Sequence, residues 1–167
     1  MNDKKIIIAM VVSTIVILFG AILLVGQSPA AVAPQISASQ NAKVSAGNTT
    51  FDWGNINYSG GYATKSFTIK NTGTDTLKLF NIKTSCHCTN AHITINGTDS
   101  PDFGMSGVSS WVGEVAPGKE AKLTVVFDPA YHGPQGVGPI TRYTSVETND
   151  SSNPKLTFTT SGIVVNK

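Results

Sequence analysis

Apolar residues follow two different patterns along the chain, which change near residue 48. Residues 6–26 form one uncharged, almost wholly apolar run, IIIAMVVSTIVILFGAILLVG. After residue 48 apolar residues recur at every second position, which is the period of a β-strand with one buried face. The two patterns together predict one apolar helix followed by an all-β domain.

The apolar run is long enough to span a membrane. A helix over residues 6–26 would be about 31 Å long, which matches a hydrocarbon core of roughly 30 Å. Lys4 and Lys5 precede it, and lysines on the short leading side keep the amino end inside. We therefore predict a cytoplasmic stub (1–5) and a transmembrane signal anchor (6–26) in the cytoplasmic or inner membrane. The remaining chain would lie outside the cytoplasm, either periplasmic or at the cell surface.

A cleavable signal peptide is the alternative interpretation of the same run. AVA at residues 31–33 resembles a cleavage site, although Pro34 follows it directly, and signal-peptide cores usually span only about 7–15 residues. The next stretch is rich in Ala, Ser, Pro and Gln and has no apolar period. Residues 27–47 are therefore predicted to be a flexible tether.

Residues 48–167 have the pattern of a β-sandwich. Phe67 and Ile69 alternate with polar residues, and so do Leu77 and Leu79, with a bulge expected near Phe80 that shifts the register to Ile82. A further predicted strand carries apolar residues at Ala121, Leu123, Val125 and Phe127. Short strands separated by turn signals such as NTGTD and NDSSNP predict an antiparallel β-sandwich.

Composition and charge narrow the function classes. Charged residues make up 13% of the chain and the net charge is +2, which is too small to indicate nucleic acid or an acidic partner. The sequence contains no paired carboxylates, nucleophile elbow, phosphate loop or zinc-protease helix. We therefore expect a module that is not an enzyme, and these motifs indicate no definite cofactor.

The nonapeptide TSCHCTNAH, residues 84–92, holds both cysteines and two of the three histidines. On a strand, Cys86 and Cys88 would share one face with their Cα atoms about 6.6 Å apart, near the upper limit for a disulfide. Two thiols on one face suit a soft metal such as Cu(I) or zinc. Three interpretations stay open: buried core residues, a soft-metal site, and thiol redox chemistry.

A metal would need a third ligand from elsewhere in the chain. If strands alternate in direction, the loop bearing His132 lies at the same end of the sandwich as the cysteines. The same count puts Met105 at the opposite end, so it is a weaker candidate ligand. His92 is also a weaker candidate, although it is only four residues from Cys88. His87 should point to the other face.

Two loops are longer than simple turns require, residues 96–114 and 128–139. Loops of this kind on a rigid scaffold often carry binding residues. Trp111 and Tyr131 are the candidate partner-binding residues within them. Both residues have an alternative role, which is to cover an edge of the core.

Five segments, in order, resemble a bacterial immunoglobulin-like domain family, domain of unknown function 1573, related to Hydin-type domains. The resemblance implies an immunoglobulin-like sandwich of seven or eight strands, usually exported, and no reaction. SCHCT has His87 where the family usually has glycine. The segments are FDWGNI, IKNTGTDTLKL, SCHCT, VAPGKEAKLTVVFDP and VETNDSSNPKLTFTTSGIV.

We therefore expect a membrane-anchored, extracytoplasmic immunoglobulin-like module that binds an unknown protein or envelope partner. The first alternative is a Cu(I)- or zinc-binding or carrier protein that uses Cys86, Cys88 and His132. The second alternative is a thiol redox protein.

Overall fold

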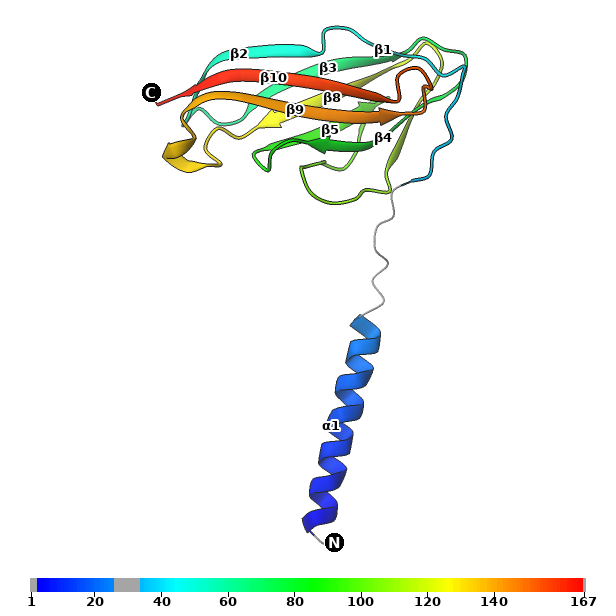
Figure 1. Ribbon diagram of the computed structural model, residues 1–167, viewed down its shortest axis with the longest axis vertical. Coiled ribbons are helices and arrows are strands. Elements are labelled where there is room, and N and C mark those ends of the chain that lie inside the picture. The colour runs from blue at the N-terminus through cyan, green and yellow to red at the C-terminus, as the bar shows by residue number, and fades with distance from the viewer. Residues whose placement is uncertain (1–2, 26–33, 167) are drawn as a thin grey trace. The chain divides into compact units, whose positions relative to one another are not determined.

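The computed structural model describes residues 3–25 and 34–166, and it contains one helix and a β-domain that we describe separately (Figure 1). Helix α1 (Asp3–Val25) is long and apolar enough to cross a membrane, and signal sequences meet the same criterion. The described side chains of α1 are almost all exposed. The predicted span therefore forms a helix, while residues 26–33, including the AVA segment, lie outside the described residues.

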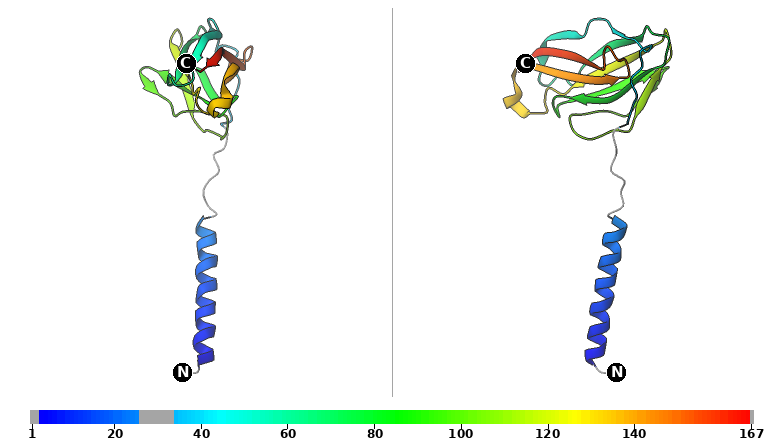
Figure 2. Two further views of the ribbon diagram at one scale, coloured as in Figure 1. Left: turned by 90° about the vertical axis from the view of Figure 1, so that its left-hand side faces the viewer. Right: turned by 45° about the vertical axis from the view of Figure 1, so that its right-hand side comes forward.

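The β-domain contains ten strands in two five-stranded sheets. The first sheet has the order β1-β3-β8-β5-β6, and the second has the order β2-β10-β9-β4-β7. Figure 2 shows the orange and red strands β9 and β10 side by side, as their antiparallel pairing requires. The strands are β1 (Val44–Ala46), β2 (Thr50–Asn57), β3 (Ala63–Asn71), β4 (Leu77–Thr84), β5 (Thr89–Ile95), β6 (Thr98–Asp99), β7 (Val112–Val115), β8 (Glu120–Phe127), β9 (Gly138–Thr148) and β10 (Lys155–Val165).

The two layers confirm the predicted immunoglobulin-like sandwich. Two of its ten strands, β1 and β6, have only three and two residues, and sequence periodicity gives little signal for elements so short. All strand pairs are antiparallel except β2 and β10, which run parallel. The sandwich is therefore mostly antiparallel, with strand β2 added to its edge in the other direction.

The core forms where the predicted apolar faces meet. Phe67 on β3 packs against Phe158 on β10 with ring centroids 5.0 Å apart, which joins the two sheets. The predicted inward residues of β8 are all buried: Ala121, Leu123, Val125 and Phe127. The register of β4 against β9 shifts between Phe80 and Lys83, where Asn81 has a positive φ of 46°. The predicted bulge is therefore confirmed, and Ile82 is buried beyond it.

The predicted tether ends earlier than residue 47. Ser39 forms a bridge with Asp150, Ala42 is fully buried, and residues 44–46 pair with β3 as strand β1. These residues fold because they find partners in the turn between β9 and β10 and at the sheet edge. We call residues 39–46 the arm, and the arm belongs to the domain.

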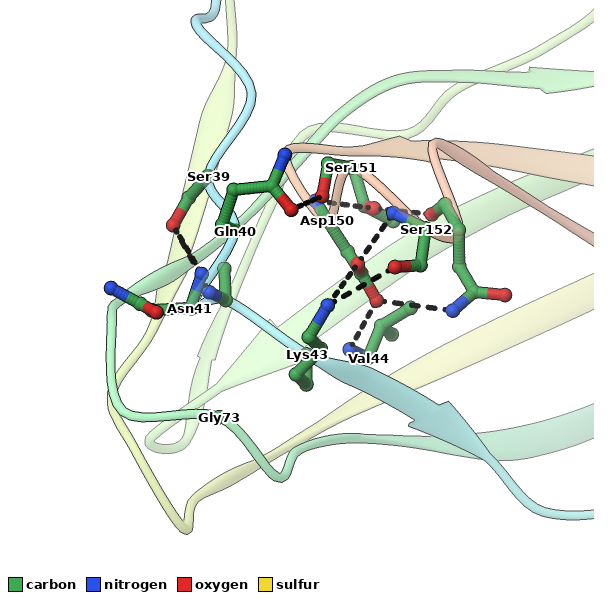
Figure 3. Close-up of polar contacts among 12 residues, drawn as sticks. Ser39, Gln40, Asn41, Lys43, Val44, Gly73, Asp150, Ser151 and Ser152 are labelled. Carbon is green, nitrogen blue, oxygen red and sulfur yellow. Dashed lines mark hydrogen bonds and ion pairs between the residues drawn. The ribbon is translucent and has the colours of Figure 1, made fainter.

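Asp150 connects the arm to the turn after β9 (Figure 3). Its side chain is fully buried and accepts hydrogen bonds from the backbone N–H groups of Val44 (3.0 Å) and Ser152 (2.9 Å), and from Asn153 Nδ2 (3.1 Å). Lys43 Nζ lies 3.6 Å from the carboxylate. Burial alone raises the pKa of Asp150, but these hydrogen bonds and the lysine charge outweigh it and lower the pKa to about 2.

We predict that Asp150 makes the domain sensitive to acid. Its pKa of about 2 lies below the ordinary 3.8, so the ionised carboxylate stabilises the fold at neutral pH. That contribution is lost as the pH falls from 3.8 towards about 2. Asp150→Asn should lower the free energy of unfolding at neutral pH by about 1–3 kcal/mol and weaken its pH dependence in that window.

Urea unfolding between neutral pH and pH 2 measures both effects. Asp99→Asn is the matched control, because Asp99 is exposed and accepts a hydrogen bond from the neighbouring Thr94. Equal stability of the Asp150 and Asp99 variants would contradict the role assigned to Asp150.

Candidate functional site

The two cysteines lie in a short turn that crosses between the sheets. Strand β4 ends at Thr84 in one sheet and β5 begins at Thr89 in the other, so residues 85–88 connect the layers at one end of the sandwich. The cysteines therefore follow the end of a strand and do not have the Cα separation of about 6.6 Å that an extended strand would give them. The turn brings their Cα atoms to 5.2 Å, within the usual range for a disulfide.

Cys86 and Cys88 form a disulfide in the structure. The turn around it is held by hydrogen bonds within the same segment. Thr84 Oγ1 contacts the carbonyl oxygens of Cys86 (3.1 Å) and Thr89 (2.8 Å), and Thr89 N donates to the Cys86 oxygen (3.1 Å). The two sulfurs are therefore positioned by a well-bonded turn rather than by a strand.

The environments of the two sulfurs differ. Cys88 is only 2% exposed and packs in a small apolar cluster with Phe127 and Ile140. Its sulfur accepts a hydrogen bond from Arg142 Nε at 3.1 Å, and Cys86 is half-buried nearer the surface. Burial lowers the pKa of Arg142, but a guanidinium keeps its charge in proteins. A positive charge therefore stands beside the buried sulfur.

His132 lies at the same end as the disulfide, as predicted. It directly precedes the short 3₁₀ helix η1 (Gly133–Gly136), in the loop between β8 and β9. His132 Nε2 is 3.5 Å from Cys86 Sγ, and the ligand atoms of Cys86, Cys88 and His132 all lie within 4.8 Å of one another. After reduction these three groups offer two thiolates and an imidazole, which is a donor set for a soft metal.

The weaker candidates lie outside this group. His92 Nδ1 pairs with Asp102 Oδ1 at 3.3 Å. The side chain of Met105 is exposed. The predicted placement of the Met105 loop at the opposite end is wrong, because the chain after β6 runs back along β5. Its neighbour Gly104 accepts a hydrogen bond from Thr84 N at 3.2 Å, beside the cysteine turn.

A groove of about 480 Å³ lies next to the disulfide. Tyr131 and Tyr62 line it and are 53% and 72% exposed, so their rings present apolar surface to solvent. Trp111 is half-buried and packs against Phe103, with ring centroids 5.5 Å apart. Its alternative role as a cover for the core is therefore the one observed. The remaining lining residues are His87, Cys88, Asn90, His92, Asp102, Val126 and Asp128.

Sequence reasoning missed Arg142 and Tyr62. Arg142 had a detectable signal, because it lies on the same inward face of β9 as three buried residues. These are Ile140, Thr144 and Val146. A charged residue in an inward row needs a partner, and the partner is Cys88. Tyr62 directly precedes β3, in the connection from β2, and has no comparable signal.

Comparison with known protein families matches one part of the chain. Residues 44–99 match the model of the family described as "Protein of unknown function (DUF1573)". The matched segment covers β1 to β6 and includes the cysteine turn, whereas His132 and Arg142 lie beyond it. The likeness of the later segments to the family, and the relation to Hydin-type domains, stay predictions. No curated protein matches the chain.

One of the solved structures that match the chain at low sequence identity has a TM-score above 0.5 and shares the fold. A protein of unknown function from Porphyromonas gingivalis W83 is 20% identical, with a TM-score of 0.58, and the match covers 78% of this chain and 50% of that one. The chain thus spans about half of that protein's length. The ASH/PapD-like domain 7 of human CEP192 is 16% identical over 84% of this chain and 98% of that domain, with a TM-score of 0.48. The YadV chaperone is 6% identical over 72% and 51%, with a TM-score of 0.44.

Proposed function

We propose that the chain is a membrane-anchored, non-enzymatic module that binds a protein partner outside the cytoplasm. The groove beside the disulfide, with its two exposed tyrosines, is the observation that carries this proposal. Exposed aromatic rings around a concave surface are typical of protein-binding sites. Helix α1 supports the anchor by its length and composition.

The lining of the groove indicates the chemistry of the partner. Tyr62 and Tyr131 offer aromatic faces, and Asp102 and Asp128 offer carboxylates. The side chain of Asp102 is 73% exposed and therefore accessible to a ligand. Aromatic faces and carboxylates together recognise ammonium and guanidinium groups. The proposed ligand is an extended segment of an extracytoplasmic protein with a lysine or arginine at its centre.

The anchor is tested by the mass of the chain after extraction from membranes. A retained anchor predicts the intact mass of the full sequence, because residues 6–26 stay attached. Cleavage after Ala33 would give a shorter chain that begins at Pro34, and that result would contradict the anchor. Alkaline carbonate washing is the second measurement, and an anchored chain stays in the membrane pellet.

The groove is tested with peptides that bear a central arginine, and with matched peptides that bear glutamate. The full chain in detergent micelles should prefer the arginine peptides. Tyr62→Ala combined with Tyr131→Ala should weaken that binding about tenfold or more, since aromatic contacts to cations contribute about 0.5–2 kcal/mol each. Fluorescence anisotropy gives the affinities.

Tyr143→Ala is the matched control for the tyrosine variants. Tyr143 is 50% exposed on β9 and does not line the groove, so its loss should leave peptide binding unchanged. Equal binding of arginine and glutamate peptides, or equal loss in the control, would refute the groove as the binding surface.

Soft-metal binding is a second candidate function, favoured by the distances among Cys86, Cys88 and His132. We expect the reduced full chain to bind Cu(I) more tightly than the Cys86→Ser/Cys88→Ser double variant in competition with a chelator. His132→Ala should weaken the binding, whereas His92→Ala should not. Affinity equal to that of the double variant, for both Cu(I) and Zn(II), would reject this function.

A further inference from the structure

We propose that the Cys86–Cys88 disulfide accepts electrons from a protein dithiol by thiol–disulfide exchange, with Cys86 attacked first and Cys88 as the leaving group. This activity uses the two cysteines of the candidate metal site, but in their disulfide form and without the tyrosines of the groove. It follows from the different surroundings of the two sulfurs, which determine the order of the steps.

Access selects the sulfur that is attacked. Cys88 is only 2% exposed and packs with Phe127 and Ile140, so an incoming sulfur has much less access to it than to Cys86, although Cys88 contributes to the groove lining. Cys86 is half-buried, and its neighbour His132 is exposed. Exchange rates depend on which sulfur an attacking thiolate reaches. The accessible sulfur in this structure is Cys86 Sγ.

Arg142 stabilises the leaving group. When the disulfide breaks, the departing Cys88 sulfur carries a negative charge in a largely apolar cluster. Arg142 Nε already lies 3.1 Å from that sulfur, so the charge forms next to a guanidinium. Hydrogen bonds between ionised groups are stronger than neutral ones, and a stabilised leaving thiolate departs faster.

The turn keeps the two sulfurs together after the bond breaks. The hydrogen bonds of Thr84 to the Cys86 and Thr89 carbonyl groups do not depend on the disulfide. Cys88 Sγ therefore stays beside Cys86 Sγ, and the disulfide can re-form when an oxidant is supplied. Groups held in contact react as if at very high concentration. This arrangement supports a reversible centre.

The electrons balance over two exchange steps. A thiolate of the partner dithiol attacks Cys86 Sγ, which forms a mixed disulfide and releases Cys88 as a thiolate. The second partner thiolate then attacks the partner's own sulfur in the mixed disulfide and releases Cys86 as a thiolate. The partner leaves as a disulfide, and two electrons have moved to this chain. Of the two protons that the partner thiols released to solvent, one is taken up by Cys86, while Cys88 stays a thiolate beside Arg142.

The first test separates the two cysteines. Full-length Cys88→Ser and Cys86→Ser variants are treated with oxidised glutathione in the presence of a metal chelator, and the mixed disulfide is followed by mass. Cys86 in the first variant should react about a hundredfold faster than Cys88 in the second, because rates depend on access. In urea the two rates should become similar. Equal rates in the folded protein, or faster reaction at Cys88, would overturn the proposal.

The second test measures the equilibrium with glutathione redox buffers. Arg142→Gln removes the charge beside Cys88 and should shift the equilibrium about tenfold towards the disulfide, or about 30 mV. Arg142→Lys should retain part of the effect. Lys83→Gln is the matched control, because Lys83 is exposed on β4.

An unchanged equilibrium in the Arg142→Gln variant would overturn the role of Arg142. Failure of dithiothreitol to reduce the disulfide in the folded wild-type chain would overturn the exchange activity itself. Neither outcome affects the tyrosine groove, whose peptide binding is measured on the oxidised chain.

Discussion

The burial of apolar side chains between two sheets is the constraint on which the other features depend. Strands β4 and β5 are consecutive in the chain but lie in different sheets, so the connection between them must cross the end of the core. Only residues 85–88 are available for that crossing. The crossing therefore takes a tight turn and not an extended path, and the turn brings Cys86 and Cys88 close enough to bond.

A fully buried Asp150 lies at one end of the sandwich and a half-buried Arg142 near the other, and the two charges have different partners. Asp150 accepts hydrogen bonds from Val44 of the arm and from Ser152 and Asn153 of its own turn, so it joins the two segments. Arg142 donates to the Thr141 carbonyl oxygen and to Cys88 Sγ, a weak acceptor that changes charge when the disulfide is reduced. The aspartate therefore has a structural role, whereas the interaction of the arginine depends on whether the disulfide is oxidised or reduced.

Alternation of apolar residues was enough to predict the sandwich, because a strand with one buried face has apolar residues at every second position. It predicted the inward residues of β3 and β8 and the bulge after Phe80. Alternating strand direction also predicted that His132 would approach the cysteines. The Met105 loop was misplaced because the count of strand directions keeps the loop after β5 at the end where β5 finishes. Residues 100–104 instead fold back along β5. The arm was missed because its order comes from distant partners such as Asp150, which local composition does not reveal.

The attachment of the arm determines how the domain would respond to mechanical load. Tension along residues 34–38 reaches the domain at Ser39 and the Asp150 turn, and then at the three-residue edge strand β1. The strand of the arm pairs with only one neighbouring strand and over only three residues, so few ladder hydrogen bonds hold it against tension. Figure 1 shows this attachment at the end of the domain opposite the loop that carries η1. Under tension the arm would therefore detach first and add a short length of extended chain, while the strands around the disulfide stay paired.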